Sequence, residues 1–271
     1  MDIQNTVAVV TGAASGIGEA VVLELAARKC RAIAMVDQSE RCCEVAEAVH
    51  KKFPAVATEA FVGDAVDAAF RERVFEQVRS KYGVAQICVP AAGITRDALA
   101  VKVDKATGKS QIYPLELFKL VIDVDLIAPI YWGMQLVAGI AEDRAARGKG
   151  RWEPEEDVQG TVIFIGSISS LGNKGQVSYA SAKAGLEGAA STLAKEAMFH
   201  GVRFGVIHPG FTDTPMVRAL GEEYIRSRIL PQTQLRRLIR TEEIADAICF
   251  MISNSAVTGE LWADAGWHPS A

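Results

Sequence analysis

The chain has 271 residues, 49% of them hydrophobic, which is enough for one large α/β core. Its formal net charge of −4 and the absence of a basic block argue against nucleic acid as a partner. The five cysteines and four histidines show no metal-binding spacing, and the odd cysteine count favours free thiols in a reducing compartment. No signal peptide and no membrane-spanning apolar run are expected, so the sequence predicts a cytoplasmic protein without a metal centre.

Short apolar runs alternate with helical patterns along the chain. Strands are expected at Thr6–Val10, Arg31–Val36, Thr58–Val62, Ala85–Pro90, Gly160–Ile165, Val202–Ile207 and Leu261–Ala263. Helices are expected at Gly18–Arg28, Glu40–Lys52, Ala68–Tyr82, Leu115–Ile140, Tyr179–His200 and Thr241–Ile252. This alternation predicts a doubly wound α/β fold, a parallel sheet of about seven strands flanked by helices in a single domain over 1–271. Two polar stretches, Lys102–Pro114 and Glu142–Gln159, are expected to be surface excursions, the first a loop or hairpin.

A glycine-rich turn joins the first strand to the first helix. It reads Thr11-Gly12-Ala13-Ala14-Ser15-Gly16-Ile17-Gly18. Glycines in such a turn let the backbone approach a pyrophosphate and let the helix pack closely on the sheet, and the helix N-terminus attracts phosphate. The turn therefore predicts dinucleotide binding by Gly12, Ser15, Gly16, Ile17 and Gly18, although a purely structural turn is the alternative.

Asp37 ends the second strand, about twenty residues after the glycines, where a dinucleotide-binding site places an acid. A carboxylate at this point accepts hydrogen bonds from the ribose hydroxyls and repels a 2′-phosphate. No Lys or Arg lies in the turn or directly after Asp37 to bind such a phosphate. The predicted cofactor is therefore NAD(H) rather than NADP(H), with capping of the next helix as the alternative role for Asp37.

Tyr179 and Lys183 are four residues apart in a predicted helix, so both side chains project from one face. We expect the ammonium group to lower the pKa of the phenol, which makes Tyr179 a candidate general acid/base. Ser167 lies twelve residues before Tyr179 and offers a second hydroxyl for the same substrate oxygen. A solvated surface pair is the alternative for Tyr179 and Lys183, and a turn residue is the alternative for Ser167, with Ser169 and Ser170 close by.

With these motifs in this order, nearly the whole chain resembles the short-chain dehydrogenase/reductase family, whose fold is a Rossmann domain. The resemblance implies an adenine contact at Asp64 and Ala65, and a cofactor floor at Ala92 and Gly93, where Ala91 replaces a usual Asn. It also implies that Pro209, Gly210, Thr212 and Thr214 form the nicotinamide segment, with Thr214 at the amide-binding position.

By the same resemblance, Tyr179 exchanges a proton with the substrate oxygen, Ser167 hydrogen-bonds that oxygen, and Lys183 holds the nicotinamide ribose. The implied activity is NAD(H)-dependent interconversion of a secondary alcohol and a ketone. Asp125 stands where the family usually has a proton-relay Asn. If it is ionised, it partly cancels the effect of Lys183 on the Tyr179 pKa; if burial protonates it, it behaves more like Asn. A packing role outside the relay is the alternative.

Substrate selection is expected in loops at 94–114, 168–177 and 211–235, beyond the strand ends. An apolar lid there suits a lipid-like, aromatic or alicyclic alcohol, and it comprises Phe211, Met216, Leu220, Tyr224 and Ile225. The arginines that follow would suit a 3-oxoacyl or 3-hydroxyacyl thioester, unless they are solvated: Arg226, Arg228, Arg236, Arg237 and Arg240.

The resemblance also implies a homo-oligomer, a tetramer or dimer. The apolar stretch Leu126–Ile140 and the side chains of Trp262 and Trp267 suit subunit contacts or the core. The unusual residues Ala91 and Asp125 leave a second hypothesis open, in which the chain is an NAD(H)-binding partner subunit or sensor with little catalysis.

Overall fold

A computed structural model describes residues 1–266, so Trp267 lies outside the described residues. Seven parallel strands form one sheet in the order β3-β2-β1-β4-β7-β8-β9. The prediction of a doubly wound, single-domain α/β fold is confirmed, with strand ends shifted by at most two residues. The strands are β1 Val7–Thr11, β2 Ala32–Asp37, β3 Ala57–Val62, β4 Ile87–Pro90, β7 Gly160–Ile165, β8 Val202–Pro209 and β9 Gly259–Ala263.

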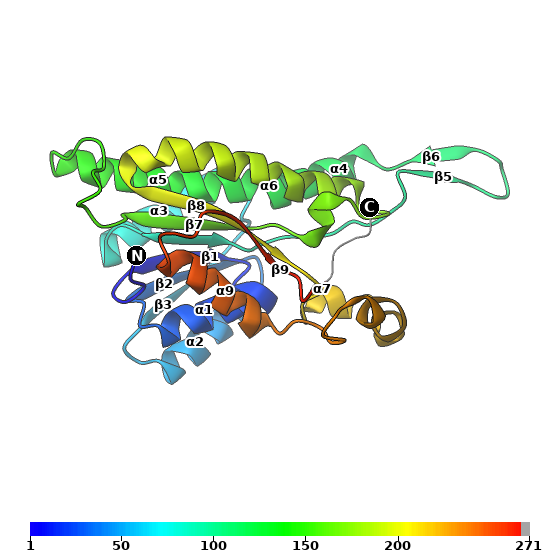
Figure 1. The fold of residues 1–271 in the computed structure, drawn as a ribbon, viewed down its shortest axis with the longest axis horizontal. Helices are drawn as coiled ribbons and strands as arrows, with labels where there is room; N and C mark the ends of the chain where they lie inside the picture. The colour runs from blue at the N-terminus through cyan, green and yellow to red at the C-terminus, as the bar shows by residue number, and fades with distance from the viewer. Residues whose placement is uncertain (267–271) are drawn as a thin grey trace.

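Helices cover both faces of the sheet (Figure 1). One layer contains α1 Gly16–Ala27, α2 Arg41–Lys52 and α9 Thr241–Ser253. The other contains α3 Ala68–Tyr82, α4 Leu115–Ile122, α5 Ala128–Ala146 and α6 Val177–Glu196. The strand order reverses between β1 and β4, and a ligand-binding crevice is expected outside the carboxyl ends of the strands at such a reversal.

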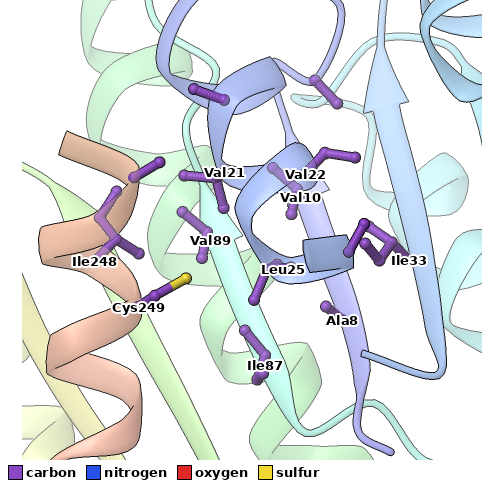
Figure 2. Packing of buried hydrophobic residues seen from close by; sticks show 14 of the residues in the cluster. Ala8, Val10, Val21, Val22, Leu25, Ile33, Ile87, Val89, Ile248 and Cys249 are labelled. Carbon is purple, nitrogen blue, oxygen red and sulfur yellow. The ribbon is translucent and has the colours of Figure 1, made fainter. Parts of the chain in front are cut away.

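Two hydrophobic clusters, one on each face, fix the sheet between the helices. Figure 2 shows the first cluster, where Val21 and Leu25 of α1 lie over β1 and β4, next to Ile248 of α9. The central strands are buried over their full length, because helices cover both of their faces. This rigid packing holds the carboxyl ends of the strands in fixed positions.

The segment Leu115–Ala146 is one continuous helical run, in which five residues at Asp123–Ile127 form a π-helical turn between α4 and α5. By length and composition this run is apolar enough to cross a membrane, so the expectation that no such run exists was wrong. Its apolar character has another explanation in the fold, because α5 packs on the sheet and places Trp132 and Leu136 in the core. Polar residues are scattered through this run, so it contains no long uninterrupted apolar stretch. A search for such stretches therefore misses its high average hydropathy.

The two polar stretches, Lys102–Pro114 and Glu142–Gln159, have different structures. The first forms the exposed antiparallel hairpin β5 Val101–Val103 and β6 Ser110–Ile112, which projects from the body (Figure 1). The second begins inside α5, and its Arg144 is buried, contrary to the expectation of a fully solvated excursion. Arg144 donates two hydrogen bonds to Glu156, at 2.9 and 3.0 Å, which tie the excursion back onto its helix.

Three short helical pieces between β8 and α9 were not predicted. They are α7 Pro215–Arg218, α8 Glu222–Tyr224 and a 3-10 turn at Leu230–Gln232, with a π-helical turn Ile225–Ile229 between the last two. A three- or four-residue helix is too short to show an apolar period, so sequence inspection places this region in a loop.

The packing of α6 on the sheet gives a first prediction. Leu186 is fully buried in the second cluster, so Leu186→Ala should lower the free energy of unfolding by about 2–5 kcal/mol. Urea denaturation measures the change. The control is Leu235→Ala, at a side chain that is 56% exposed, which should stay within about 0.5 kcal/mol of the wild type. Equal effects of the two substitutions would contradict the placement of α6.

Candidate active site

The glycine-rich turn lies between β1 and α1 and leaves no room for a side chain at Gly12 or Gly18. A Cβ on Gly18 would lie 2.1 Å from the Gly12 carbonyl oxygen, and one on Gly12 would lie 2.7 Å from the Ala92 nitrogen. Gly12 also has a φ of +66°, which favours glycine. Ser15 caps α1 with extended backbone but makes no side-chain capping bond, and Gly16 and Ile17 open the helix. The first-turn N–H groups of α1 thus suit a phosphate group.

Asp37 is the last residue of β2, and its carboxylate turns toward this glycine-rich turn. Its Oδ2 accepts a 3.0 Å hydrogen bond from the Ala14 N–H, and its Oδ1 accepts one of 3.0 Å from Ser39. Helix α2 begins only at Arg41, so Asp37 lies outside the cap position, which Glu40 occupies. The carboxylate therefore lies beside the turn. It also follows the glycines by the number of residues that is typical of a ribose-binding acid.

The ends of β3 and β4 place the next predicted residues. Asp64 accepts a hydrogen bond from Val66 at 2.9 Å, and the Ala65 carbonyl accepts one of 2.8 Å from the Trp132 indole. The Ala92 N–H donates to the Thr11 hydroxyl at 3.1 Å, which ties the β4 end to the glycine-rich turn. A Cβ on Gly93 would lie 3.1 Å from the Asp125 carboxylate, so this position admits little more than glycine.

The segment after β8 crosses the end of the sheet. A Cβ on Gly210 would lie 2.7 Å from the Asp264 carbonyl oxygen, so the backbone here is tightly packed. The Thr212 side chain is buried and donates to the Gly210 carbonyl at 3.0 Å. The Thr214 hydroxyl caps α7 by accepting from the Val217 N–H at 3.3 Å. With Pro209, these residues line a cleft at the carboxyl edge of the sheet.

The structure places Ser167 and Tyr179 in the lining of that cleft, and Lys183 next to Tyr179. Ser167 follows β7 and its side chain lowers the pKa of Tyr179, although burial raises that pKa more; the Ser167 hydroxyl accepts a 3.0 Å hydrogen bond from the Ser169 N–H. Tyr179 and Lys183 lie on successive turns of α6, and the Lys183 ammonium lies 5.4 Å from the centroid of the Tyr179 ring. Two hydroxyl-bearing residues thus line the cleft, and one cation lies beside the Tyr179 ring.

Asp125 lies in the π-helical turn and is fully buried. Its Oδ2 lies 3.2 Å from the Lys183 Nζ, and its Oδ1 accepts a 2.9 Å hydrogen bond from the Ile94 N–H. A π-helical turn widens the helix by one residue and is often found at functional sites. Here it directs a carboxylate of the long helix toward the ammonium group of α6.

Burial and charge act in opposite directions on these groups. Burial raises the pKa of Asp125, although Lys183 and the Ile94 N–H favour its ionised form. Burial disfavours the Lys183 cation, but the Asp125 and Tyr179 charges outweigh this and raise its pKa. Desolvation also raises the pKa of Tyr179, and the lowering by Lys183 and Ser167 does not overcome it. The expected net lowering of the Tyr179 pKa was therefore wrong for the protein without ligands, and Asp125 adds to the increase.

The cleft has a volume of about 230 Å³ and receives residues from each of the three loop regions. Two larger hollows of about 380 Å³ each contain none of the predicted site residues. The cleft lining includes Ile17, Thr95, Asp97, Ser167, Ser169, Gln176, Tyr179, Phe211, Thr214, Met216, Leu220 and Tyr224. Ile225, expected in the lid, is instead buried in the protein.

Sequence reasoning missed two residues at this site. Asp97 lines the cleft, where its negative charge raises the pKa of Tyr179, and it accepts a 2.8 Å hydrogen bond from Gln176. His208 lies behind Ser167, with its Nδ1 3.2 Å from the Ser167 carbonyl oxygen. Asp97 has no motif around it and only its loop position could have drawn attention to it, whereas His208 directly precedes the segment that begins at Pro209.

Comparison with known proteins assigns this arrangement to a family. Residues 12–268 match the sequence profile described as enoyl-(acyl carrier protein) reductase. The chain is 35% identical over 265 residues to a 3-oxoacyl-[acyl-carrier-protein] reductase of Pseudomonas aeruginosa, covering 96% of this chain and 95% of that protein. It is 31% identical over 263 residues to the enzyme of that name in Escherichia coli, covering 96% of both chains.

The chain belongs to the short-chain dehydrogenase/reductase family, as the motifs predicted. It is an NAD(P)-dependent oxidoreductase that interconverts a CH–OH group and a ketone. The geometry fits a nicotinamide dinucleotide, because the turn at Gly12 and Gly18 leaves space only for backbone and the adjacent helix N-terminus is positioned for phosphate.

The buried Asp125–Lys183 pair gives a second prediction. Because the Asp125 charge raises the pKa of Tyr179, Asp125→Asn should lower that pKa. Alcohol oxidation needs the deprotonated phenol, so the rising limb of kcat/KM against pH should move to lower pH. The profiles of the two proteins, measured with one alcohol substrate, test this. Superimposable rising limbs would show that the Asp125 carboxylate carries no charge at the pH of the limb.

Proposed function

We propose that the protein is an NAD(H)-dependent reductase of 3-oxoacyl thioesters, which also oxidises the corresponding 3-hydroxyacyl thioesters. The observation that carries this proposal is that Ser167 and Tyr179 line one cleft at the carboxyl edge of the sheet, with the buried Lys183 ammonium beside the Tyr179 ring. The names of the relatives support the substrate class, since the Pseudomonas and Escherichia enzymes are 3-oxoacyl-[acyl-carrier-protein] reductases.

In this proposal the Tyr179 hydroxyl gives its proton to the carbonyl oxygen during reduction and takes it back during oxidation. The Ser167 hydroxyl, which lines the same cleft as Tyr179, donates to the same oxygen and stabilises its developing negative charge. The bound nicotinamide supplies or accepts the hydride. Lys183 favours the phenolate and binds the cofactor ribose, and Asp125 holds the Lys183 ammonium in place.

The cleft lining is better suited to binding an acyl chain than to binding an anionic group of the substrate. Phe211, Met216 and Leu220 supply apolar surface beside Tyr179. Three of the five arginines at this end pair with two glutamates: Arg226 lies 2.7 Å from Glu223, and Arg237 and Arg240 lie 2.7 and 3.2 Å from Glu243. We therefore assign substrate selection to the loops at 94–114, 168–177 and 211–235, with the apolar side chains rather than the arginines as the main contacts.

The remaining cofactor-binding roles follow the geometry of the strand ends. We assign the pyrophosphate to Gly12, Ser15, Gly16, Ile17 and Gly18. We assign the adenosine ribose to Asp37, the adenine to Asp64 and Ala65, and the cofactor floor to Ala92 and Gly93. The nicotinamide end falls to Pro209, Gly210, Thr212 and Thr214, all of which line the cleft.

We infer a homo-oligomer, a dimer or tetramer, that associates through the outer face of the long helix. The large apolar side chains Leu120, Ile127, Tyr131 and Met134 are exposed along this face. We also infer a cytoplasmic location, which is supported by the five cysteines, all of which are free within the described residues.

The acid/base role gives a third prediction. Tyr179→Phe removes the hydroxyl but keeps the ring, so kcat for 3-oxoacyl thioester reduction should fall about 10²–10⁴-fold while NADH binding changes little. Steady-state kinetics and an NADH fluorescence titration measure the two effects. A matched enoyl thioester serves as control substrate, because the matching sequence profile is named for enoyl reduction.

Turnover of the enoyl thioester alone would overturn the proposed substrate class. Tight NADH binding with no turnover of any ketone, in the wild type as in Tyr179→Phe, would instead favour a cofactor-binding subunit or sensor.

The position of Asp37 gives a fourth prediction. Because its carboxylate repels a 2′-phosphate, the wild type should bind NADH at least about tenfold more tightly than NADPH. Asp37→Ala should reduce the ratio of the NADPH Kd to the NADH Kd, because it weakens NADH binding and removes the repulsion of NADPH. Titrations of both proteins with both cofactors measure it. Equal or tighter NADPH binding by the wild type would contradict the assignment.

A further inference from the structure

A second cluster of ionisable side chains lies behind the cleft, outside the proposed catalytic groups. It consists of Glu187 on α6, His208 on β8 and Glu260 on β9. One ligand atom from each residue lies within 4.8 Å of the others. The His208 ring is fully buried and stacks on Trp262, with 4.2 Å between ring centroids. The three residues are far apart in the sequence, and only the sheet brings them together.

The two nitrogens of His208 have different surroundings. Nδ1 lies 3.2 Å from the Ser167 carbonyl oxygen, which can only accept, so Nδ1 carries the hydrogen. The remaining nitrogen, Nε2, lies 3.3 Å from a Glu260 carboxylate oxygen and 3.9 Å from one of Glu187. In the neutral ring its lone pair therefore faces two carboxylates. This arrangement is repulsive unless a cation lies between them.

The hydrogen-bonding pattern supports a cation. Neither His208 Nε2 nor Glu187 Oε1 has a hydrogen-bond partner within residues 1–266, and both atoms are buried. An orphaned buried polar atom is costly, so native proteins rarely leave one without a partner. A proton on Nε2 could point toward only one of the two carboxylates, and the short contact with Glu260 lacks hydrogen-bond geometry. A metal ion, in contrast, contacts all three groups at once.

We propose that Glu187, His208 and Glu260 bind one divalent transition-metal ion, for which Zn²⁺ is the best-fitting candidate. Nitrogen and carboxylate ligands bind Zn²⁺ at about 2.0–2.2 Å, which places tetrahedral ligand atoms about 3.3–3.6 Å apart. The His208–Glu260 distance of 3.3 Å already meets this requirement. Glu187 lies 3.9 Å from His208 Nε2, and all three ligand atoms lie within 4.8 Å of one another, so Glu187 must move closer to bind the ion. The fourth position can be filled by water, because both glutamates are partly exposed.

The contact between His208 Nδ1 and the Ser167 carbonyl is of a kind found in known metal sites. A metal-bound histidine usually donates its other ring N–H to a carbonyl or carboxylate, which fixes its tautomer and orientation. The His208 ring also packs tightly against Gly166, the residue before Ser167, since a Cβ on Gly166 would lie 2.6 Å from His208 Nδ1. The bound ion would thus hold α6, β8 and β9 together behind the Ser167 backbone.

The experiment uses the full-length protein with the background substitution Cys43→Ser, because an exposed thiol binds zinc by itself. Zinc is removed with a chelator, and ZnCl₂ is then titrated by calorimetry, with thermal unfolding as a second readout. The test variants are Glu260→Gln and Glu187→Gln, which are partly exposed and should fold normally; His208→Gln is added only if it folds. The control is Glu155→Gln, at an exposed glutamate outside the cluster.

We expect about one Zn²⁺ per chain and a rise in melting temperature of about 5 °C or more at a zinc concentration ~100 times Kd. Each test variant should weaken binding at least ~10-fold, and Glu155→Gln should not. No zinc binding below ~1 mM, or binding unchanged in both glutamate variants, would overturn the proposal and leave a proton on His208 as the cation. These readouts do not depend on the substrate or on turnover, so a failure of the proposed function would leave them unaffected.

Discussion

The buried contact between Lys183 and Asp125 is the constraint on which the site depends. It joins α6 to the π-helical turn of the long helix, and both partners are removed from water. Removing one member of such a pair would leave an uncompensated charge in the protein interior, so the two helices are held in one relative position. The Ile94 N–H attaches the end of β4 to the same carboxylate. One side chain thereby aligns three elements around the cleft.

Helix α6 connects the contact between Lys183 and Asp125 to residues on either side of Lys183. Tyr179, Lys183 and Glu187 follow one another at four-residue intervals, so they form one stripe on the helix. Tyr179 lines the cleft, Lys183 contacts the buried Asp125, and Glu187 reaches the end of β8, where His208 contacts the Ser167 carbonyl. The proposed catalytic groups and the proposed metal ligands are therefore parts of one continuous packing arrangement.

Much of the fold was predictable because strand and helix periods are local. The strands and the main helices appear within a few residues of their predicted positions, and α3 has the predicted bounds. Predictions were poorer where a residue's environment depends on distant parts of the chain. Arg144 is polar but buried by its pairing with Glu156, and Ile225 is buried in a segment expected to be a lid. The Tyr179 pKa is raised because desolvation outweighs the nearby cation.

The sequence by itself determined the order of strands and helices along the chain, the glycine-rich turn before α1, and the placement of Tyr179 and Lys183 on one helix face. Each of these follows from residue spacing along a single element. Only the tertiary structure decided that Asp125 contacts Lys183 and that His208 lies between two glutamates behind Ser167. These contacts join residues from different elements, and only the packing of helices on both faces of the sheet sets their distances and burial.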